Sequence, residues 1–198
     1  LYYNDVQQRS FDASVLASIP LVEGMGPEGA TYAVVLSETC FYPEGGGQEG
    51  DHGSLTTDGT SRQVLDTQKE GNLILHLCDG PLEIGDLVRG TIDWRRRKQL
   101  MDHHTAVHIV GGAARRILGP HIYQAGANKS IEIARLDITH YRRLGRDDLD
   151  AIETLANEVL GQVSRTEKTI LPRHEADKKH GFDLYQGGAP KGNQIRVL

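Results

Sequence analysis

The chain has 198 residues, of which 38% are hydrophobic and 25% are charged, and its formal net charge is −5. This composition is typical of a soluble globular protein with one large domain or two small ones, and it argues against a protein that coats nucleic acid nonspecifically. No apolar run is long enough to span a bilayer and nothing resembles a secretory signal, so we expect a cytoplasmic protein.

The two cysteines, Cys40 and Cys78, are too few for a disulfide framework. Both lie in apolar stretches with the composition of strands. We therefore expect them to be small buried hydrophobic residues rather than a disulfide bridge or a metal site.

The first part of the chain, residues 1–93, is predicted to form a small antiparallel β-barrel or sandwich. Glycine and proline separate short apolar stretches that are rich in β-branched and aromatic residues, which is the pattern of strands joined by turns. Residues 4–18 could add a further strand. The clearest strand-like stretches are 30–42, 53–59, 62–78 and 82–94.

The second part, residues 94–198, begins with a change to helical spacing. Residues 95–118 are predicted to form a helix that ends at Gly119 and Pro120. Gly111 and Gly112 lower the stability of this helix, which suggests close packing against another backbone.

Further elements after this helix indicate an α+β arrangement. Residues 131–141 alternate as a strand does, and a helix is predicted to start at Asp147 and Asp148. A strand at 163–171, a short helix at 173–180 and extended pieces at 182–185 and 194–198 follow. There is no regular βαβ alternation, so we predict helices packed on an antiparallel sheet. The helix starting at Asp147 has one apolar stripe: Leu149, Ile152, Leu155, Ala156, Val159 and Leu160.

Three basic runs interrupt an otherwise acidic chain. They could hold an RNA backbone locally, because affinity follows local phosphate contacts rather than net charge, or they could be solvated faces of helices and loops. The runs are Arg95, Arg96, Arg97 and Lys98; Arg142, Arg143 and Arg146; and Lys178 and Lys179.

His104 and His108 lie one helical turn apart in the stretch HHTAVHIVGG. This spacing puts both imidazoles on one helix face, roughly 5–6 Å apart at Cβ, where they could bind one metal ion. The residue after the first histidine is Thr105 and not glutamate, which disfavours a metalloprotease. Zinc needs further ligands, so the pair taken alone favours hydrogen-bonded structural histidines over a metal site.

Four blocks, read together, resemble one known family. FYPEGGGQEGDHG (41–53), IDWRRRKQLMDHHTAVH (92–108), YQAGANKS (123–130) and ARLDITHY (134–141) are similar in order and spacing to the editing domain of alanyl-tRNA synthetase. Freestanding AlaX proteins and the threonyl-tRNA synthetase editing domain share this architecture. The wording of ITHY and FDLYQGGAP is closest to the archaeal branch of the synthetase.

The resemblance implies a barrel followed by an editing core that hydrolyses the ester of tRNA(Ala) mischarged with serine or glycine. It assigns His104 and His108 to zinc, together with a later Cys-x-x-x-His motif that we expect beyond Leu198. Neither cysteine of this chain lies after the helix, so it would carry half of the zinc site. The full-length protein would also bind alanine and ATP through an upstream aminoacylation domain.

The resemblance also suggests roles for individual residues. A pocket that selects alanine excludes serine and glycine poorly, so a second, hydrolytic site is useful. Thr105 matches a family position that meets the serine hydroxyl, although a helix threonine can also cap its own backbone. Gln124 matches an editing-pocket glutamine. The substrate-binding candidates are Gly45, Gly46, Gly47 and Gln48, a loop that could contact the tRNA 3′ end or be a tight turn, together with Arg95 and Arg97.

Two other functions are compatible with these residues. A freestanding AlaX-type deacylase would use the same site without an aminoacylation domain. A non-catalytic tRNA-binding module would use only the barrel and the basic runs.

Overall fold

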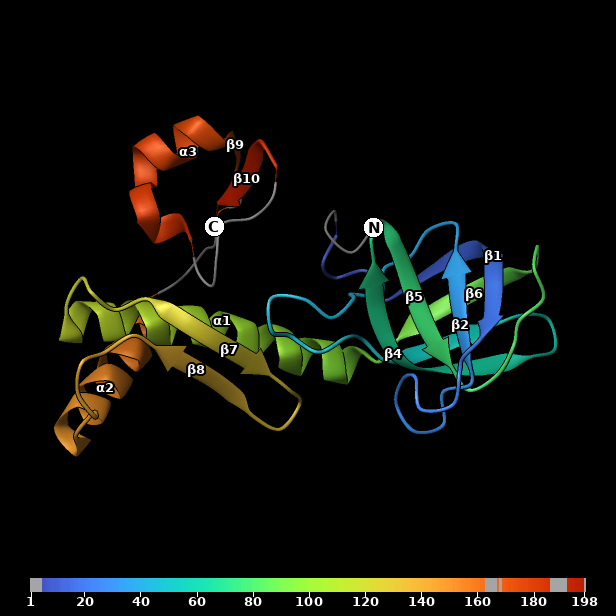
Figure 1. Ribbon diagram of the computed structural model, residues 1–198, viewed down its shortest axis with the longest axis horizontal. Coiled ribbons are helices and arrows are strands. Elements are labelled where there is room, and N and C mark those ends of the chain that lie inside the picture. Colours follow the sequence, from blue (N-terminus) through green and yellow to red (C-terminus); the bar gives the residue numbers. More distant parts are fainter. Residues whose placement is uncertain (1–4, 163–166, 168, 186–191, 198) are drawn as a thin grey trace. The chain divides into compact units, whose positions relative to one another are not determined.

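The structure is a computed structural model that describes residues 5–162, 167, 169–185 and 192–197. It confirms the predicted α+β class, because a closed antiparallel barrel is followed by helices and small sheets (Figure 1). In the described residues no helix is long and apolar enough to cross a membrane.

Six strands close the barrel in the order β1-β2-β5-β4-β3-β6. Every predicted strand-like stretch of the first part contributes to it, and the stretch at 62–78 forms a hairpin of two strands. Closure leaves no free sheet edge, since β1 pairs with both β2 and β6. The strands are β1 (Ser10–Pro20), β2 (Tyr32–Leu36), β3 (Gly53–Thr56), β4 (Ser61–Glu70), β5 (Leu73–Cys78) and β6 (Leu87–Ile92).

The barrel interior is filled by every second residue of its strands. In β1 the buried side chains are those of Phe11, Ala13 and Val15, as the period of two requires. Gly90 of β6 faces Phe11, and a Cβ there would lie 2.3 Å from the ring. The glycine therefore gives the aromatic ring its space.

Both cysteines are buried in this core and are free thiols, which confirms the prediction. Burial raises the pKa of Cys40 to about 11 and that of Cys78 to about 12. Neither thiol is activated for nucleophilic chemistry at neutral pH.

After the barrel, α1 (Trp94–Leu118) matches the predicted helix and begins one residue earlier. The strands β7 (Gln124–Lys129) and β8 (Ala134–Ile138) form a separate two-stranded sheet, and α2 (Arg146–Gln162) follows. The C-terminal elements are β9 (Thr169–Pro172), α3 (Arg173–His180), the 3₁₀ helix η1 (Gly181–Leu184) and β10 (Gln194–Val197), with β9 paired to β10.

Two predictions for this part need correction, and a third is tested only in part. The strand predicted at 131–141 is only β8, because Ser130 and Ile133 bond to each other in a turn and leave Ile131 and Ile133 exposed. Residues 182–184, predicted to be extended, lie in η1. Of the strand predicted at 163–171, residues 169–171 lie in β9, and residues 163–166 and 168 fall outside the described residues.

The apolar stripe of α2 is buried only at its centre. Ile152 and Ala156 are buried and pack with Ala113 and Ala114 of α1, whereas the outer stripe residues Leu149 and Leu160 are about half exposed. The expectation that the stripe is one continuous core face is therefore wrong at both ends.

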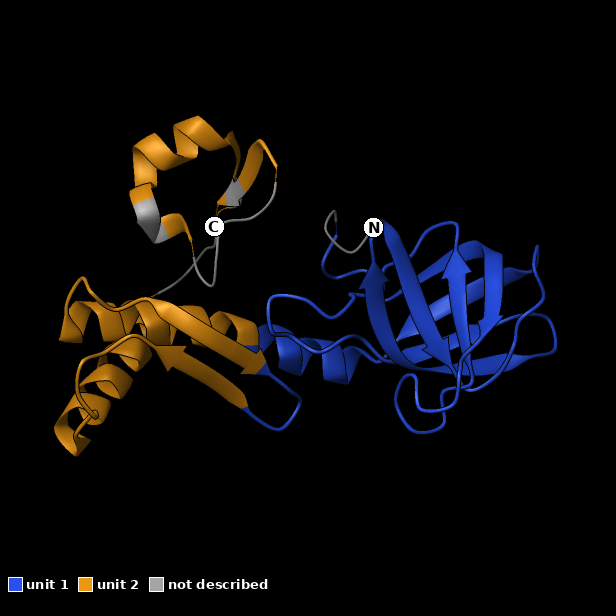
Figure 2. Cartoon of the chain, viewed as in Figure 1, with its two compact units in different colours: residues 1–103, 129–133 blue, residues 104–128, 134–198 orange. Residues whose placement is uncertain are grey.

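The chain divides into two compact units (Figure 2). Unit 1 comprises residues 1–103 and 129–133, and unit 2 comprises residues 104–128 and 134–198. The domain boundary between residues 93 and 94 stays a prediction. The compact units divide within α1, whose first turns bond to the loop that precedes β3.

His76 of β5 is a fully buried histidine inside unit 1. Its Nδ1 lies 3.0 Å from the Val34 carbonyl and must carry the proton, so Nε2 accepts from the Thr39 hydroxyl at 2.9 Å. That hydroxyl in turn accepts from the Phe41 amide. Burial lowers the pKa of His76 to about 4, which keeps the ring neutral.

This ring predicts a pH-dependent stability of the barrel. The unfolded chain takes up a proton at His76 below pH 6.5, whereas the folded chain does so only near pH 4, so the stability present above pH 6.5 is lost on acidification. Each unit between the two pKa values is worth about 1.4 kcal/mol, and the total loss should be on the order of 3 kcal/mol. Urea unfolding followed by Trp94 fluorescence between pH 4 and 7 measures it.

The matched control is His76→Gln, which cannot take up a proton. Its unfolding free energy should vary less over this range than that of the wild type. Identical pH profiles for the two proteins would contradict the role of His76.

Candidate functional site

The imidazoles of His104 and His108 lie on the same side of α1. Their ring centroids are 5.0 Å apart with an angle of 23° between the planes, and both residues are half-buried. This is the arrangement in which two ring nitrogens can approach one cation. Thr105, between them in sequence, is exposed.

The pair would fit two positions of a zinc site. Within the described residues, no group of three or more histidine, cysteine, aspartate or glutamate side chains is arranged to hold a metal ion. Zinc prefers four ligands, or three with an open position. Zinc binding therefore stays a prediction that requires ligands from other residues.

Gln124, the first residue of β7, lines a cleft of about 550 Å³ in unit 2. This volume lies in the range of small-molecule sites. Gly111, Gly112 and Arg115 form the part of its wall contributed by α1. They follow His108 by three, four and seven residues, and these spacings place them on the helix face that carries the imidazoles.

Gly111 and Gly112 do not pack closely against another backbone, and that prediction is wrong. A Cβ at Gly112 would have nothing within 4 Å, and one at Gly111 would meet only the Leu136 side chain at 3.6 Å. The two glycines instead keep the wall of the cleft free of side chains.

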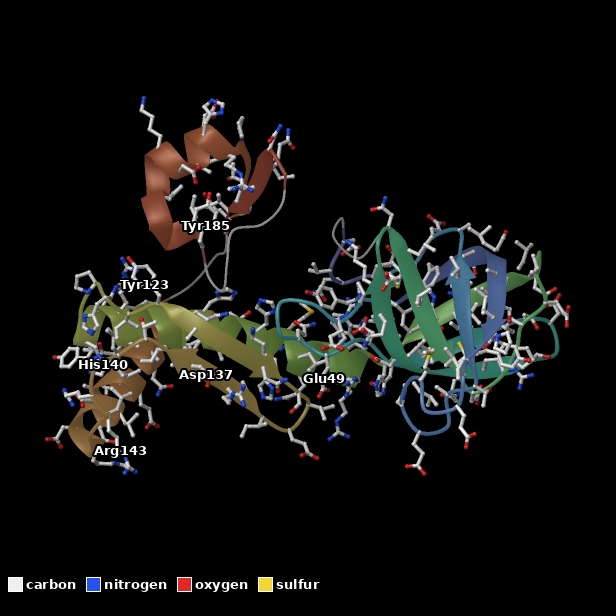
Figure 3. The ribbon with its side chains drawn as sticks, in the orientation of Figure 1. Glu49, Tyr123, Asp137, His140, Arg143 and Tyr185 are labelled. Atoms are coloured by element: carbon white, nitrogen blue, oxygen red, sulfur yellow. The ribbon has the colours of Figure 1, made fainter. Side chains whose placement is uncertain are left out.

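The cleft is also basic and aromatic, which the sequence reasoning missed. The Arg115 guanidinium lies over the ring of Tyr123 at 4.8 Å from its centroid, and Arg116 lines the same cleft. Tyr123, labelled in Figure 3, directly precedes β7. The position of Arg115 seven residues after His108 is the signal that could have found it. An anionic ligand with a flat ring would suit this lining.

The glycine loop belongs to unit 1 and is a tight turn. Gly45 and Gln48 bond to each other through both backbone groups at 3.0 Å, and Gly46 and Gly47 have φ values of 59° and 74°. Positive φ at both central positions defines a type I′ turn and favours glycine at each. Gln48 is buried, with 3% of its surface exposed, whereas Gly46 is exposed.

The basic run at the start of α1 is not one exposed face, and that expectation is wrong for two of its members. Arg95 is exposed, but Arg96 and Arg97 are buried. Arg96 donates to Glu49 at 2.7 Å and to the Gly50 carbonyl at 3.3 Å. Lys98 is exposed and pairs with Asp102 one turn later.

Arg97 forms a buried ion pair with Asp51. Its Nε lies 2.9 Å from each carboxylate oxygen, and its Nη2 donates to the same carboxylate and, at 2.7 Å, to the Cys40 carbonyl. Asp51 also accepts from the Tyr42 amide at 2.8 Å. We therefore assign Arg97 to the core of unit 1 rather than to substrate; for Arg95, substrate binding stays a prediction.

The other basic runs are on the surface, and the second is largely neutralised. Arg142 donates to Asp148 at 2.6 and 2.9 Å, and this contact lowers the pKa of Asp148 to about 2. Arg146 pairs with Asp150. The third run, Lys178 and Lys179, is exposed in the last turn of α3.

The whole chain is similar in sequence to known proteins. The model for class II tRNA synthetases (A) matches residues 1–96. The alanine–tRNA ligase of Haloquadratum walsbyi is 44% identical over 198 residues, and that of Pyrococcus furiosus is 46% identical over 200 residues. Both matches cover 100% of this chain.

The chain is homologous to a region of alanine–tRNA ligase. The alanine–tRNA ligase of Halobacterium salinarum is also 46% identical over the whole chain. The chain spans about a fifth of these relatives, 21% of their length in each case. The homology therefore covers the barrel, α1 with its imidazole pair, and the cleft, but not most of the ligase.

The Arg97–Asp51 pair generates a stability prediction. Asp51→Asn removes the negative charge and leaves a buried guanidinium unpaired, so the unfolding free energy should fall by about 3–5 kcal/mol. Urea unfolding at neutral pH, followed by Trp94 fluorescence, measures this change.

Asp102→Asn is the matched control because it breaks the exposed pair with Lys98 on the same helix. Its cost should stay below about 1 kcal/mol. Equal losses in the two variants would show that the buried pair has no special role.

Proposed function

We propose that this chain is the editing region of an alanine–tRNA ligase and hydrolyses the ester bond of tRNA(Ala) mischarged with serine or glycine. The observation that carries the proposal is the His104–His108 pair, whose rings lie side by side on one face of α1. The homology to alanine–tRNA ligase, which extends over the whole chain, supports it.

The cleft of unit 2 supports the proposal as a place for substrate. Its α1 wall continues the face that carries the imidazoles, and Gln124 presents an amide to it. Arg115 and Arg116 add positive charge beside the exposed ring of Tyr123. A charged, flat nucleotide at the end of a tRNA has matching chemistry, because RNA ends are recognised by stacking and by contacts to phosphate.

Zinc is the cofactor that the donor chemistry of this face suits. His104 and His108 would hold it, with further ligands from residues other than those described. When bound, zinc would supply Lewis-acid chemistry at the ester carbonyl or hold the amino group of the substrate. The chain's own contribution is to hold two imidazoles next to each other on one face of α1.

Selection of serine over alanine is assigned to Thr105. Its hydroxyl can bond to the hydroxyl of a seryl ester, and an alanyl ester offers no such bond. Losing this bond costs about 1–3 kcal/mol, or roughly ten- to a hundredfold in rate. Thr105 is exposed in the structure, so a substrate can reach it.

The first test is deacylation by the natural full-length protein that carries this region, with zinc present. It should hydrolyse Ser-tRNA(Ala) and spare Ala-tRNA(Ala). His104→Ala should lower the rate by about 100-fold or more, because even outer-shell partners of metal ligands cost 10- to 100-fold. Equal hydrolysis of both substrates, or of neither, contradicts the proposal.

His174→Ala is the control, since His174 is an exposed histidine on α3 that is 82% accessible. It should keep the wild-type rate. A non-catalytic tRNA-binding module would instead show no deacylation in any of these proteins and unchanged RNA affinity in His104→Ala.

A separate test concerns specificity. Thr105→Val removes the hydroxyl but keeps the shape of the side chain. The ratio of kcat/KM for Ser-tRNA(Ala) over Ala-tRNA(Ala) should fall by about ten- to a hundredfold. An unchanged ratio would move the selection of serine to another residue, and Gln124→Leu would be the next variant to measure.

A further inference from the structure

Lys129, the last residue of β7, is one of the few buried charged side chains that the structure describes, with 2% of its surface exposed. Lysine is almost never fully buried unless it is paired. Desolvation lowers its pKa, so the buried position opposes the charged form. A favourable contact must therefore offset the cost of burying the ammonium group.

That contact is with the glycine turn. The Lys129 Nζ donates to the Gly46 carbonyl at 2.7 Å. Its backbone amide donates to the Gly47 carbonyl at 2.6 Å, and its own carbonyl accepts from the Glu49 amide at 3.1 Å. Lys129 thus bonds to three residues of the loop. Its backbone also forms an isolated parallel bridge with Gln48. All of these atoms belong to unit 1.

The direction of the remaining amides follows from the planarity of the peptide. The carbonyl and the N–H of one trans peptide point in opposite directions. Because Lys129 binds the Gly46 carbonyl, the Gly47 N–H points away from it. The Gly46 N–H likewise points away from the Gly45 carbonyl, which accepts from Gln48 and from the Tyr42 hydroxyl. Within the part of the chain that the structure describes, neither glycine amide has a protein acceptor.

We propose that Lys129 is a positioning residue for substrate. It fixes the carbonyl side of the Gly45–Gln48 turn, and this leaves the Gly46 and Gly47 amides oriented to donate to a phosphate or ribose oxygen at the 3′ end of the tRNA. Lys129 itself does not touch the substrate. The role rests on the proposed function. The hydrogen bonds between Lys129 and the turn, called the clasp below, are a property of unit 1 and are tested separately.

Lysine at this position does what other residues cannot. Gly46 and Gly47 lack side chains, so the turn can be held only through its backbone. A long side chain with a single ammonium reaches the Gly46 carbonyl while its backbone stays in β7. The side chains of methionine and glutamine are both one atom shorter than that of lysine; methionine has no donor, whereas glutamine keeps an amide donor.

The first experiment measures the turn alone by NMR on the 198-residue chain. In Lys129→Met the amides of Gly46 and Gly47 should become more mobile and exchange faster, while the amides of the barrel strands keep their wild-type protection. Lys129→Gln should show the same change to a smaller extent. Unchanged Gly46 and Gly47 amides, or global unfolding of the barrel in both variants, would overturn the clasp as a local device.

The second experiment adds an acceptor-stem RNA minihelix that ends in CCA. In the wild type the Gly46 and Gly47 amide signals should shift on addition of the RNA, and in Lys129→Met these shifts should be lost. Absence of the shifts in the wild type would overturn the orientation of these amides toward RNA, whatever the clasp measurement shows.

The third experiment separates positioning from structure by kinetics in the natural full-length protein. Lys129→Met should raise KM for Ser-tRNA(Ala) by about tenfold, as expected for losing an amide hydrogen bond, with kcat and zinc content unchanged. A fall in kcat in proportion to folded protein would make Lys129 merely structural. If the wild type itself does not deacylate, the proposed function fails, and the two NMR results still decide the clasp.

Discussion

A buried ion pair between Arg97 and Asp51 joins the start of α1 to the segment between β2 and β3. The segment between β2 and β3 has no strand of its own, so its path depends on side chains that hold its backbone. Asp51 accepts from Tyr42, its carbonyl accepts from the Thr67 hydroxyl at 2.8 Å, and its carboxylate binds Arg97. A buried pair of this kind adds little stability over an apolar contact, but a wrong arrangement would leave a bare charge in the core. It therefore specifies one path for the loop.

The same helix serves three purposes in successive turns. Its first turns carry Arg96 and Arg97, which bond to the loop of unit 1. Its middle carries the imidazole pair, and its last turns form a wall of the cleft. The helix also packs against the rest of unit 2 through Ala113 and Ala114, which lie in one core cluster with Ile152 and Ala156 of α2.

The sequence predicted the elements with clear patterns and missed those that depend on tertiary contacts. Alternation and turn residues located the barrel strands, and the helical spacing of His104 and His108 correctly predicted that their rings lie together. Strand β7 was missed because QAGANK is rich in residues that strands disfavour. It forms because its partner β8 and the glycine turn both bond to it.

The sequence also did not reveal which charged side chains are buried. The run of Arg95 to Lys98 looks uniform, and only the positions of Glu49 and Asp51 decide that two of the four side chains turn inward. Lys129 was likewise considered only as part of the motif YQAGANKS (123–130). Its partners are carbonyl groups of glycines more than eighty residues earlier in the chain, and no local pattern reveals backbone acceptors.

The assignment of residues 129–133 to unit 1 has a consequence for how the polypeptide is made. As the nascent chain leaves the ribosome, the barrel strands and the start of α1 are outside when His103 emerges, but Lys129, which bonds to the glycine turn, has not yet emerged. Unit 1 must therefore wait for β7 before its last backbone contacts close. A protein shortened at His103 would lack the contacts of Lys129 with the glycine turn. Unit 1 is therefore complete only when residues 129–133 are included.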